Sequence, residues 1–212
     1  DALAPGGFRV GADLTQNTGG TAFVPMGRGG DDAEYHLPRT LRRVKMGIIV
    51  HLISEVGHIG DEAVDETSLG DKVTKRNKRN KIKLILRDCL RQPSVGIIEE
   101  NPAKGLVKYA KPAGVIASLV PTTNPCLTPA GQIVYAIKAR DVMICSPHPR
   151  AKVVTNKIID IIRATLVREG APADIIQGIK DPSINLTKVL MERCDLVIAT
   201  GGRPMVKSAY SS

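Results

Sequence analysis

Residues 115–150, VIASLVPTTNPCLTPAGQIVYAIKARDVMICSPHPR, decide the fold. An apolar run at 115–120 ends at Pro121, and residues 128–138 have helical character. A second apolar run at 141–145 is closed by Ser-Pro-His-Pro. Short apolar runs that end at proline-rich turns and flank a helix are typical of a strand–helix–strand unit.

The same alternation continues towards the C-terminus. Residues 151–169 predict a helix with Gly170 as its C′ residue, 174–177 a short strand, 183–193 a helix and 196–199 a strand. Strands that alternate with helices indicate a parallel sheet with right-handed crossovers. The predicted fold class is therefore α/β, a Rossmann-like parallel sheet with flanking helices.

The chain before this unit divides into three parts. Residues 94–99 and 106–110 are β-prone and flank a turn, which predicts a β-hairpin. Residues 39–92 are expected to be a helical segment that packs on the α/β domain of residues 93–212. It has one stretch with apolar residues at helical spacing up to Val56, an interruption at Gly57 and Gly60, and a second stretch at about 71–90. Residues 1–38 are Gly-rich and irregular in pattern.

Composition limits the classes of function. Hydrophobic residues make up 42% and aromatic residues 3%, so the core must be aliphatic, as suits a parallel sheet covered on both faces. No apolar run approaches the roughly 20 residues of a membrane helix. The four cysteines have no zinc-type spacing, and no metal site is expected. Reduced, buried thiols in a cytoplasmic protein are the simplest interpretation.

The formal net charge of +9 includes a run of seven basic residues and no acid at 72–83. Three interpretations of this run are open: a solvated helix face, attraction of phosphate groups such as those of coenzyme A, or contact with nucleic acid. No aromatic residue is interleaved with the run, so it offers no platform for stacking bases. Nucleic acid is the least favoured partner.

Three loops follow predicted strands, at 121–125, 146–150 and 200–204. Ligands of parallel sheets bind beyond the carboxyl ends of the strands, so all three loops belong on one edge. Gly201 and Gly202 would let a phosphate approach backbone N–H groups at a helix start. Ser146, His148 and Arg150 could contact a ribose or phosphate, and Asn124 could orient a substrate.

Each loop also has a simpler interpretation. The two glycines can form a turn that binds no ligand. Ser146–Pro147 and the residues after it can be a rigid connection between strand and helix. Asn124-Pro125 can be an ordinary turn. Cys126 follows the first loop, but no histidine or acid beside it in sequence would activate it, so we do not favour it as a nucleophile.

Taken together, the motifs resemble the coenzyme domain of the aldehyde dehydrogenase superfamily, and specifically its CoA-acylating branch. The segments that carry the resemblance are KPAGVI at 111–116, VPTTNP at 120–125, SPHPRAK at 146–152, REGAP at 168–172, and DLVIATGG at 195–202 with AYSS at 209–212. The resemblance is good from about residue 94 onwards.

The resemblance implies that an aldehyde, NAD and coenzyme A are converted to acyl-CoA and NADH through a cysteine thioester. Thr200, Gly201 and Gly202 would lie by the pyrophosphate, and Ser146, Pro147 and His148 along the adenosine, with Arg150 also in the cofactor site. Thr122, Thr123 and Asn124 would face the nicotinamide and the substrate oxygen. NADP is the alternative cofactor.

The resemblance also implies partners and a location. These are the aldehyde and coenzyme A, a second copy in a dimer or tetramer formed through the hairpin at about 94–110, and the shell of a bacterial microcompartment. No membrane is expected. The family's nucleophilic cysteine would follow residue 212, so these residues alone are expected to be inactive. The alternatives are a non-catalytic nucleotide-binding or scaffold protein of the same fold, or a basic nucleic-acid-binding protein.

Overall fold

The computed structural model describes residues 58–210. The predicted helix that ends near Val56 and the Gly-rich segment 1–38 lie outside the described residues. The first two helices are α3 (Ile59–Thr67) and α4 (Lys72–Arg91). The predicted interruption at Gly57 and Gly60, after the stretch that ends near Val56, falls partly outside the described residues, and Gly60 itself lies in the first turn of α3. It packs closely on α4, because a Cβ there would lie 3.4 Å from the Cβ of Lys75.

A four-stranded parallel sheet lies at the centre, in the order β5-β4-β3-β6. Its strands are β3 (Val115–Val120), β4 (Val142–Pro147), β5 (Ile176–Gly178) and β6 (Leu196–Ala199). The predicted parallel Rossmann-like sheet is confirmed. The strand β4 runs two residues further than its apolar run, because Ser146 and Pro147 still pair with the end of β3.

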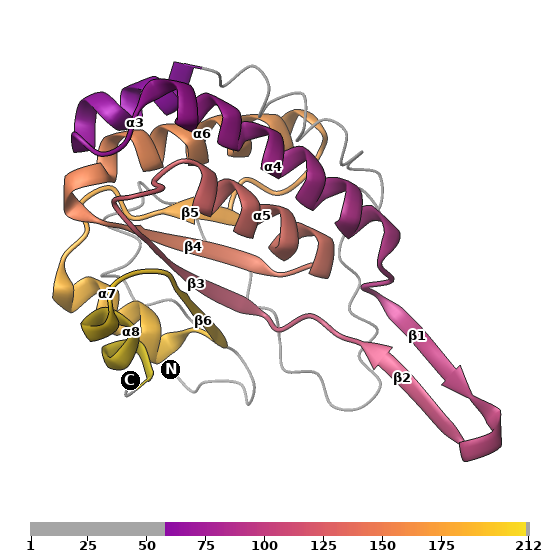
Figure 1. The fold of residues 1–212 in the computed structure, drawn as a ribbon. Helices are drawn as coiled ribbons and strands as arrows, with labels where there is room; N and C mark the ends of the chain where they lie inside the picture. Colours follow the sequence, from indigo (N-terminus) through magenta and orange to yellow (C-terminus); the bar gives the residue numbers. More distant parts are fainter. Residues whose placement is uncertain (1–57, 211–212) are drawn as a thin grey trace.

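Helices cover both faces of this sheet, as Figure 1 shows. On one face lie α5 (Leu127–Ala139) and α6 (Lys152–Arg168), the latter preceded by the 3-10 turn η3 (Pro149–Ala151), with α3 and α4 packed over them. On the other face lie α7 (Ile184–Arg193) and α8 (Arg203–Tyr210). Within residues 58–210, none of the helices combines the length and apolarity that crossing a membrane would require.

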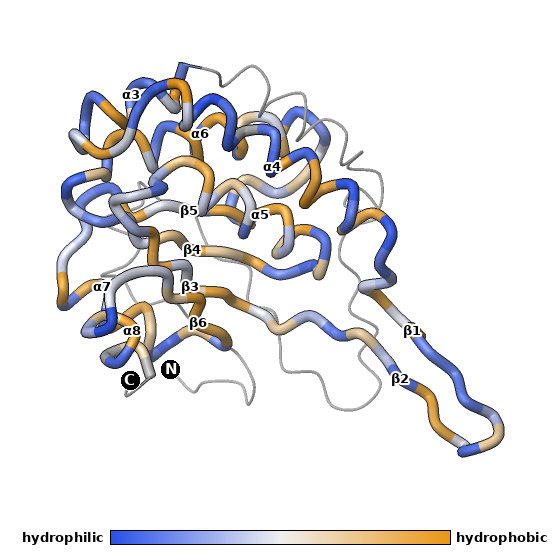
Figure 2. Tube along the Cα trace, in the orientation of Figure 1, coloured by the Kyte–Doolittle hydropathy of each residue, from blue (hydrophilic) through white to orange (hydrophobic). Residues whose placement is uncertain are grey.

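The residues of β3 explain why it is one of the two inner strands of the sheet. All six are buried, and successive side chains of a strand point to opposite faces of the sheet. Ile116 and Val120 join the cluster under α5 and α6, whereas Val115 and Ala117 join the cluster with α7 residues such as Leu186. Figure 2 shows the apolar strands surrounded by helices that are hydrophilic on their outer sides.

The hairpin is also confirmed. The strands β1 (Gly96–Asn101) and β2 (Leu106–Ala110) pair antiparallel across the 3-10 turn η2 (Pro102–Lys104). This hairpin stands away from the body of the domain (Figure 1). Four of its apolar side chains are about half exposed or more: Ile97, Leu106, Val107 and Tyr109.

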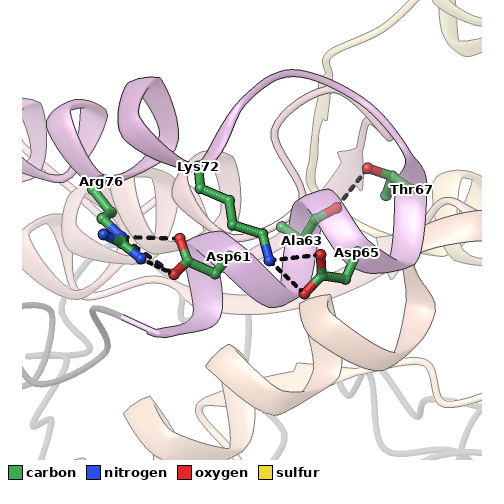
Figure 3. A network of polar contacts seen from close by, with 6 residues as sticks. All are labelled: Asp61, Ala63, Asp65, Thr67, Lys72 and Arg76. Carbon is green, nitrogen blue, oxygen red and sulfur yellow. Dashed lines mark hydrogen bonds and ion pairs between the residues drawn. The ribbon is translucent and has the colours of Figure 1, made fainter.

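Ion pairs join α3 to α4, as Figure 3 shows. Arg76 pairs with Asp61, and the Nζ of Lys72 lies 2.9 Å from Asp65. The hydrogen bond from Arg76 is the main reason why the pKa of Asp61 lies below its usual value. Two residues of the basic run therefore have acidic partners on the neighbouring helix.

Candidate nucleotide-binding edge

The order of the strands places a topological switch point at one edge of the sheet, where a ligand-binding crevice is expected. From β3 the chain adds β4 and β5 on one side and then β6 on the other, so the topology switches between β3 and β6. In open α/β sheets ligands bind outside the carboxyl ends of the strands at such a switch point. The loops 121–126 and 200–202 border this crevice.

Backbone hydrogen bonds hold the predicted loops at this edge. The N–H of His148 donates to the carbonyl oxygen of Val120 over 3.1 Å, and the N–H of Thr200 donates to that of Leu119 over 3.3 Å. The last residue of β3 therefore lies between the loops that follow β4 and β6. The expectation that the three loops share one edge agrees with this geometry.

The side chain of Gln132 connects three elements below the crevice. Its Oε1 accepts a hydrogen bond of 2.5 Å from Ser118 Oγ on β3, and its Nε2 donates to Thr200 Oγ1 over 3.4 Å. A glutamine on the sheet-facing side of α5 thus fixes the start of the glycine loop. The sequence pattern gave no indication of this role, because Gln132 lies 68 residues from Thr200.

The glycine loop leads directly into α8. Gly201 and Gly202 are exposed, and Met205 and Val206 donate their N–H groups to the carbonyl oxygen of Gly202. A Cβ added at Gly202 would meet only Pro204 Cδ, at 3.8 Å. The backbone at Gly202 is therefore open to a ligand. Because Met205 and Val206 already donate to Gly202 and Pro204 has no N–H, a phosphate at this helix start would be met by the N–H groups of Gly202 and Arg203.

The loop after β4 is held by the protein itself. Ser146 is buried, and its Oγ lies 2.8 Å from Thr187 Oγ1 on α7. His148 Nδ1 accepts from the N–H of Arg150 over 3.1 Å, whereas the Arg150 guanidinium donates to the carbonyl oxygen of Thr67 over 3.1 Å. This contact favours the interpretation of Arg150 as part of a rigid connection.

Helix α6 begins against a carboxylate from another helix. The two oxygens of Glu66 accept hydrogen bonds from the N–H groups of Val153, at 3.0 Å, and Val154, at 2.8 Å. Ala151, the cap residue of α6, makes no side-chain cap bond. Since a carboxylate already satisfies the start of α6, the start of α8 is the better candidate for a phosphate at this edge.

A buried lysine supports the loop after β3. Lys75 on α4 is only 4% exposed, and its Nζ donates to the carbonyl oxygen of Thr123 over 2.5 Å. Thr155 Oγ1 on α6 donates to the carbonyl oxygen of Pro125 over 3.0 Å. Two side chains on other helices therefore fix the backbone on both sides of Asn124.

The Oδ1 of Asn124 is buried and has no hydrogen-bond partner among the described residues. Buried polar atoms normally have a partner, so an orphaned one indicates that a ligand or another part of the protein supplies it. Cys126, next but one, is buried as a thiol, and burial raises its pKa despite the charge of Lys75. A buried thiol with a raised pKa is a poor nucleophile.

A groove between α4 and α5 reaches this loop. It has a volume of about 370 Å³, and Asn124, Thr128 and Gln132 line it from the side of α5. Lys78, Lys81 and Ile82 line it from α4. The groove therefore connects the crevice residues Asn124 and Gln132 to the outer surface of the basic helix.

Burial of Lys75 has a consequence for stability. Desolvation is the main reason why its pKa lies below 10.5, and the charge of Lys78 adds to the effect. The unfolded chain therefore binds more protons than the folded one between the lowered pKa and 10.5, so Lys75 costs stability at neutral pH and the cost disappears as pH rises through 10.5.

We therefore expect the free energy of unfolding of the wild type, relative to Lys75→Met, to increase from neutral pH towards 10.5. Urea denaturation of both proteins at several pH values measures this difference. Lys83→Met, at an exposed position on the same helix, is the control. Parallel pH profiles for the wild type and Lys75→Met would contradict the assignment of a buried, charged Lys75.

A parallel sheet covered by helices on both faces places this domain in the Rossmann-like class of α/β folds. A sequence model described as the aldehyde dehydrogenase family matches residues 77–212, and the chain belongs to this family.

Two curated relatives and a solved structure narrow this placement. The chain is 43% identical over 172 residues to a sulfoacetaldehyde dehydrogenase from an Acholeplasma species and 46% identical over 155 residues to a succinate-semialdehyde dehydrogenase (acetylating) from Clostridium kluyveri. These matches cover 80% and 71% of this chain but 35% and 34% of the relatives. The fold is similar to an acetylating aldehyde dehydrogenase from Geobacillus thermoglucosidasius, with a TM-score of 0.72, 30% identity, and coverage of 82% of this chain and 41% of that one. The homologues are acylating aldehyde dehydrogenases, and this chain corresponds to about a third of their length.

Proposed function

We propose that this chain is the coenzyme-binding part of an NAD-dependent, CoA-acylating aldehyde dehydrogenase. The observation that carries the proposal is the switch point between β3 and β6, where the loop 200–202, with its open backbone at Gly202, follows β6 and the loop that holds Asn124 follows β3. Gly201 lies under the side chain of Met205. The acylating relatives support the proposal. In the proposed reaction an aldehyde, NAD⁺ and coenzyme A are converted to acyl-CoA, NADH and a proton.

The residues at the crevice fit a dinucleotide. Thr200, Gly201 and Gly202 would hold the pyrophosphate through the start of α8, because no side chain fills the space above Gly202. Ser146, Pro147 and His148 would lie along the adenosine, with Ser146 oriented by Thr187. Arg150 would act through the loop that it braces against α3. When bound, NAD would supply the acceptor for the hydride of the aldehyde.

The substrate end of the crevice would be formed by Thr122, Thr123 and Asn124. The Nδ2 group of Asn124 is suited to donate to the substrate oxygen, because Lys75 and Thr155 fix the backbone around it, whereas its buried Oδ1 can only accept. A preorganised amide needs no reorientation as charge develops on that oxygen. We propose that the nucleophilic cysteine belongs to the part of the family's length that this chain does not cover.

Further parts of the proposal rest on the family alone. NADP is the alternative cofactor, and the exposed apolar side chains of the β1–β2 hairpin would be suited to contact a second copy in a dimer or tetramer. A cytoplasmic location, with enclosure in a bacterial microcompartment as a variant of it, stays a prediction.

Gly202→Val tests the cofactor site. The added side chain has room in the free protein, since its Cβ would meet only Pro204, but it would crowd a pyrophosphate at the start of α8. We expect NADH to bind about tenfold more weakly, equivalent to roughly 1.4 kcal/mol. Fluorescence titration measures the affinity, and circular dichroism verifies that the variant is folded.

The smaller Gly202→Ala variant should give an intermediate loss, because crowding increases with side-chain size. Unchanged NADH affinity in both variants would remove the glycine loop from the cofactor site. Tight, salt-sensitive binding of RNA by a protein without affinity for NADH would overturn the proposal as a whole and favour a nucleic-acid-binding protein.

A further inference from the structure

Helix α4 places lysines where a packed helix normally places apolar residues. Lys75, Lys78 and Ile82 are spaced by three and four residues, so they share one face of the helix. This face lies towards α5, where Ile82 and Leu86 are buried in the core. Lys75 and Lys78 therefore lie on the face of α4 that packs against the protein, and not on its solvated side.

The lysines of the groove differ from the other basic residues at the start of α4. Lys72 and Arg76 pair with Asp65 and Asp61 of α3. Lys78 and Lys81 make no ion pair or hydrogen bond with any residue in 58–210, although both line the groove that reaches Asn124. The described part of this groove thus has two unneutralised cations and no carboxylate on its walls.

The composition of the groove suits a small amphipathic molecule. Ile82, Ile85 and Leu127 give it apolar walls, Thr128 and Gln132 add polar groups, and its volume of about 370 Å³ lies at the small end of ligand sites. A molecule of a few carbon atoms could place its reacting carbonyl near Asn124 and its other end between the lysines.

We propose that this groove selects aldehydes that carry an anionic group, a carboxylate or sulfonate, at the end opposite the carbonyl, and that Lys78 and Lys81 are the specificity-determining residues. This inference rests on the proposed function, because it takes Asn124 as the place of the substrate oxygen. The lysines contribute binding and orientation, and no bond to them is made or broken.

Electrostatics at the inner end of the groove agree with this assignment. Lys78 and the buried Lys75 repel one another, and this repulsion contributes to the lowered pKa of Lys75. An anion near Lys78 would be attracted by both charges and would offset their repulsion. Partly buried charges interact more strongly than solvated ones, because water screens them less.

Unreactive probes test the inference on the 212-residue chain. Propionate and ethanesulfonate supply the two anions, and propionamide and ethanesulfonamide are neutral analogues of nearly the same shape. Each is titrated into the protein with NADH present, and amide signals of Thr128 and Gly131 in the groove are followed by NMR. The anions should bind and the amides should bind more weakly; the preferred anion identifies the substrate group.

Variants of α4 localise the effect. The double variant Lys78→Met/Lys81→Met should bind the preferred anion about fivefold more weakly than the wild type. This loss is larger than removal of one exposed ion pair would give, because two charges are removed. Lys83→Met is the matched control, since it removes the same charge from a residue about 200° around the helix from Lys81. It should leave the affinity unchanged, and added salt should weaken binding to the wild type.

The outcomes separate this inference from the proposed function. Anion selection by the groove would be overturned if anions and amides bind equally well, or if the Lys78/Lys81 and Lys83 variants have equal effects. It would also be overturned if a titration with coenzyme A shows that the Lys78/Lys81 variant binds coenzyme A more weakly but binds the small anion as the wild type does. NADH titration of the same variants is the independent measurement. If NADH fails to bind even the wild type, the proposed function fails, whatever the anions do.

Discussion

Gly114→Val should lower the free energy of unfolding by about 4 kcal/mol, the sum of roughly 2 for backbone strain and roughly 2 for a steric collision. Gly114 has a φ of +116°, which a β-branched residue does not adopt without strain. A Cβ at this position would lie 2.9 Å from Cγ of Asp195 and still closer to one carboxylate oxygen. That oxygen accepts the N–H of Val115 over 2.8 Å at the start of β3, so the collision strains the junction of β3 with β6. Urea denaturation measures the loss.

Gly96→Val separates strain from collision. Gly96 also has a positive φ, of +73°, but nothing lies within 4 Å of the position of its Cβ. This variant should therefore cost only about 1.5 kcal/mol. If both variants lose the same stability, the Asp195 carboxylate moves aside freely and does not hold the start of β3 in place.

The sheet could be predicted because its information is local. An apolar run of six residues that ends at a proline, as at 115–120, predicts a buried strand without any knowledge of its neighbours. Alternation with helices then implies a parallel sheet, and a parallel sheet places all loops that follow its strands on one edge. The edge that holds Asn124, Ser146 and Thr200 therefore followed from pattern alone.

The supports of the site could not be predicted because they depend on contacts between distant residues. Lys75 lies 48 residues from Thr123, and Gln132 lies 68 residues from Thr200. Nothing in the sequence distinguishes Lys75 from the other six basic residues of the run 72–83. Their roles differ because α4 turns one face to α5, another to α3 and a third to water.

Two glycines that the sequence marks in the same way have different places in the structure: one lies within a helix and the other follows the end of a helix. Composition alone could not separate them. Gly60 suggested a helix boundary and lies in the first turn of α3, where a Cβ would be in contact with Lys75 of α4 at 3.4 Å. Gly170, by contrast, ends α6 with a φ of +84°, as expected for a residue after a helix. A glycine predicts a boundary reliably only when a left-handed conformation is required there.

Glu66→Ala should lower the free energy of unfolding by about 2 kcal/mol. Its carboxylate accepts the N–H groups of Val153 and Val154 in the first turn of α6, which has no side-chain cap of its own. The change leaves both donors without their partner and removes a negative charge from the positive end of the helix dipole. Glu66→Gln keeps one oxygen acceptor and should lose about half as much, because the charge and one bond are gone. Chemical denaturation of the three proteins should show that the free energy of unfolding decreases from the wild type to Glu66→Gln and further to Glu66→Ala.

Glu62→Ala is the matched control, because Glu62 lies one turn earlier on α3 and also contacts α6. It does so through an exposed ion pair with Lys157, at 2.6 Å, and not through the backbone. Exposed pairs contribute less than about 1 kcal/mol, so this variant should be nearly as stable as the wild type. A loss as large as that of Glu66→Ala would mean that general attraction between α3 and α6, and not the cap, holds the start of α6. The start of α6 immediately follows the loop of Ser146 and His148. If Glu66 acts as a specific cap, its removal should also disturb this loop. NADH should then bind more weakly to Glu66→Ala than to Glu62→Ala.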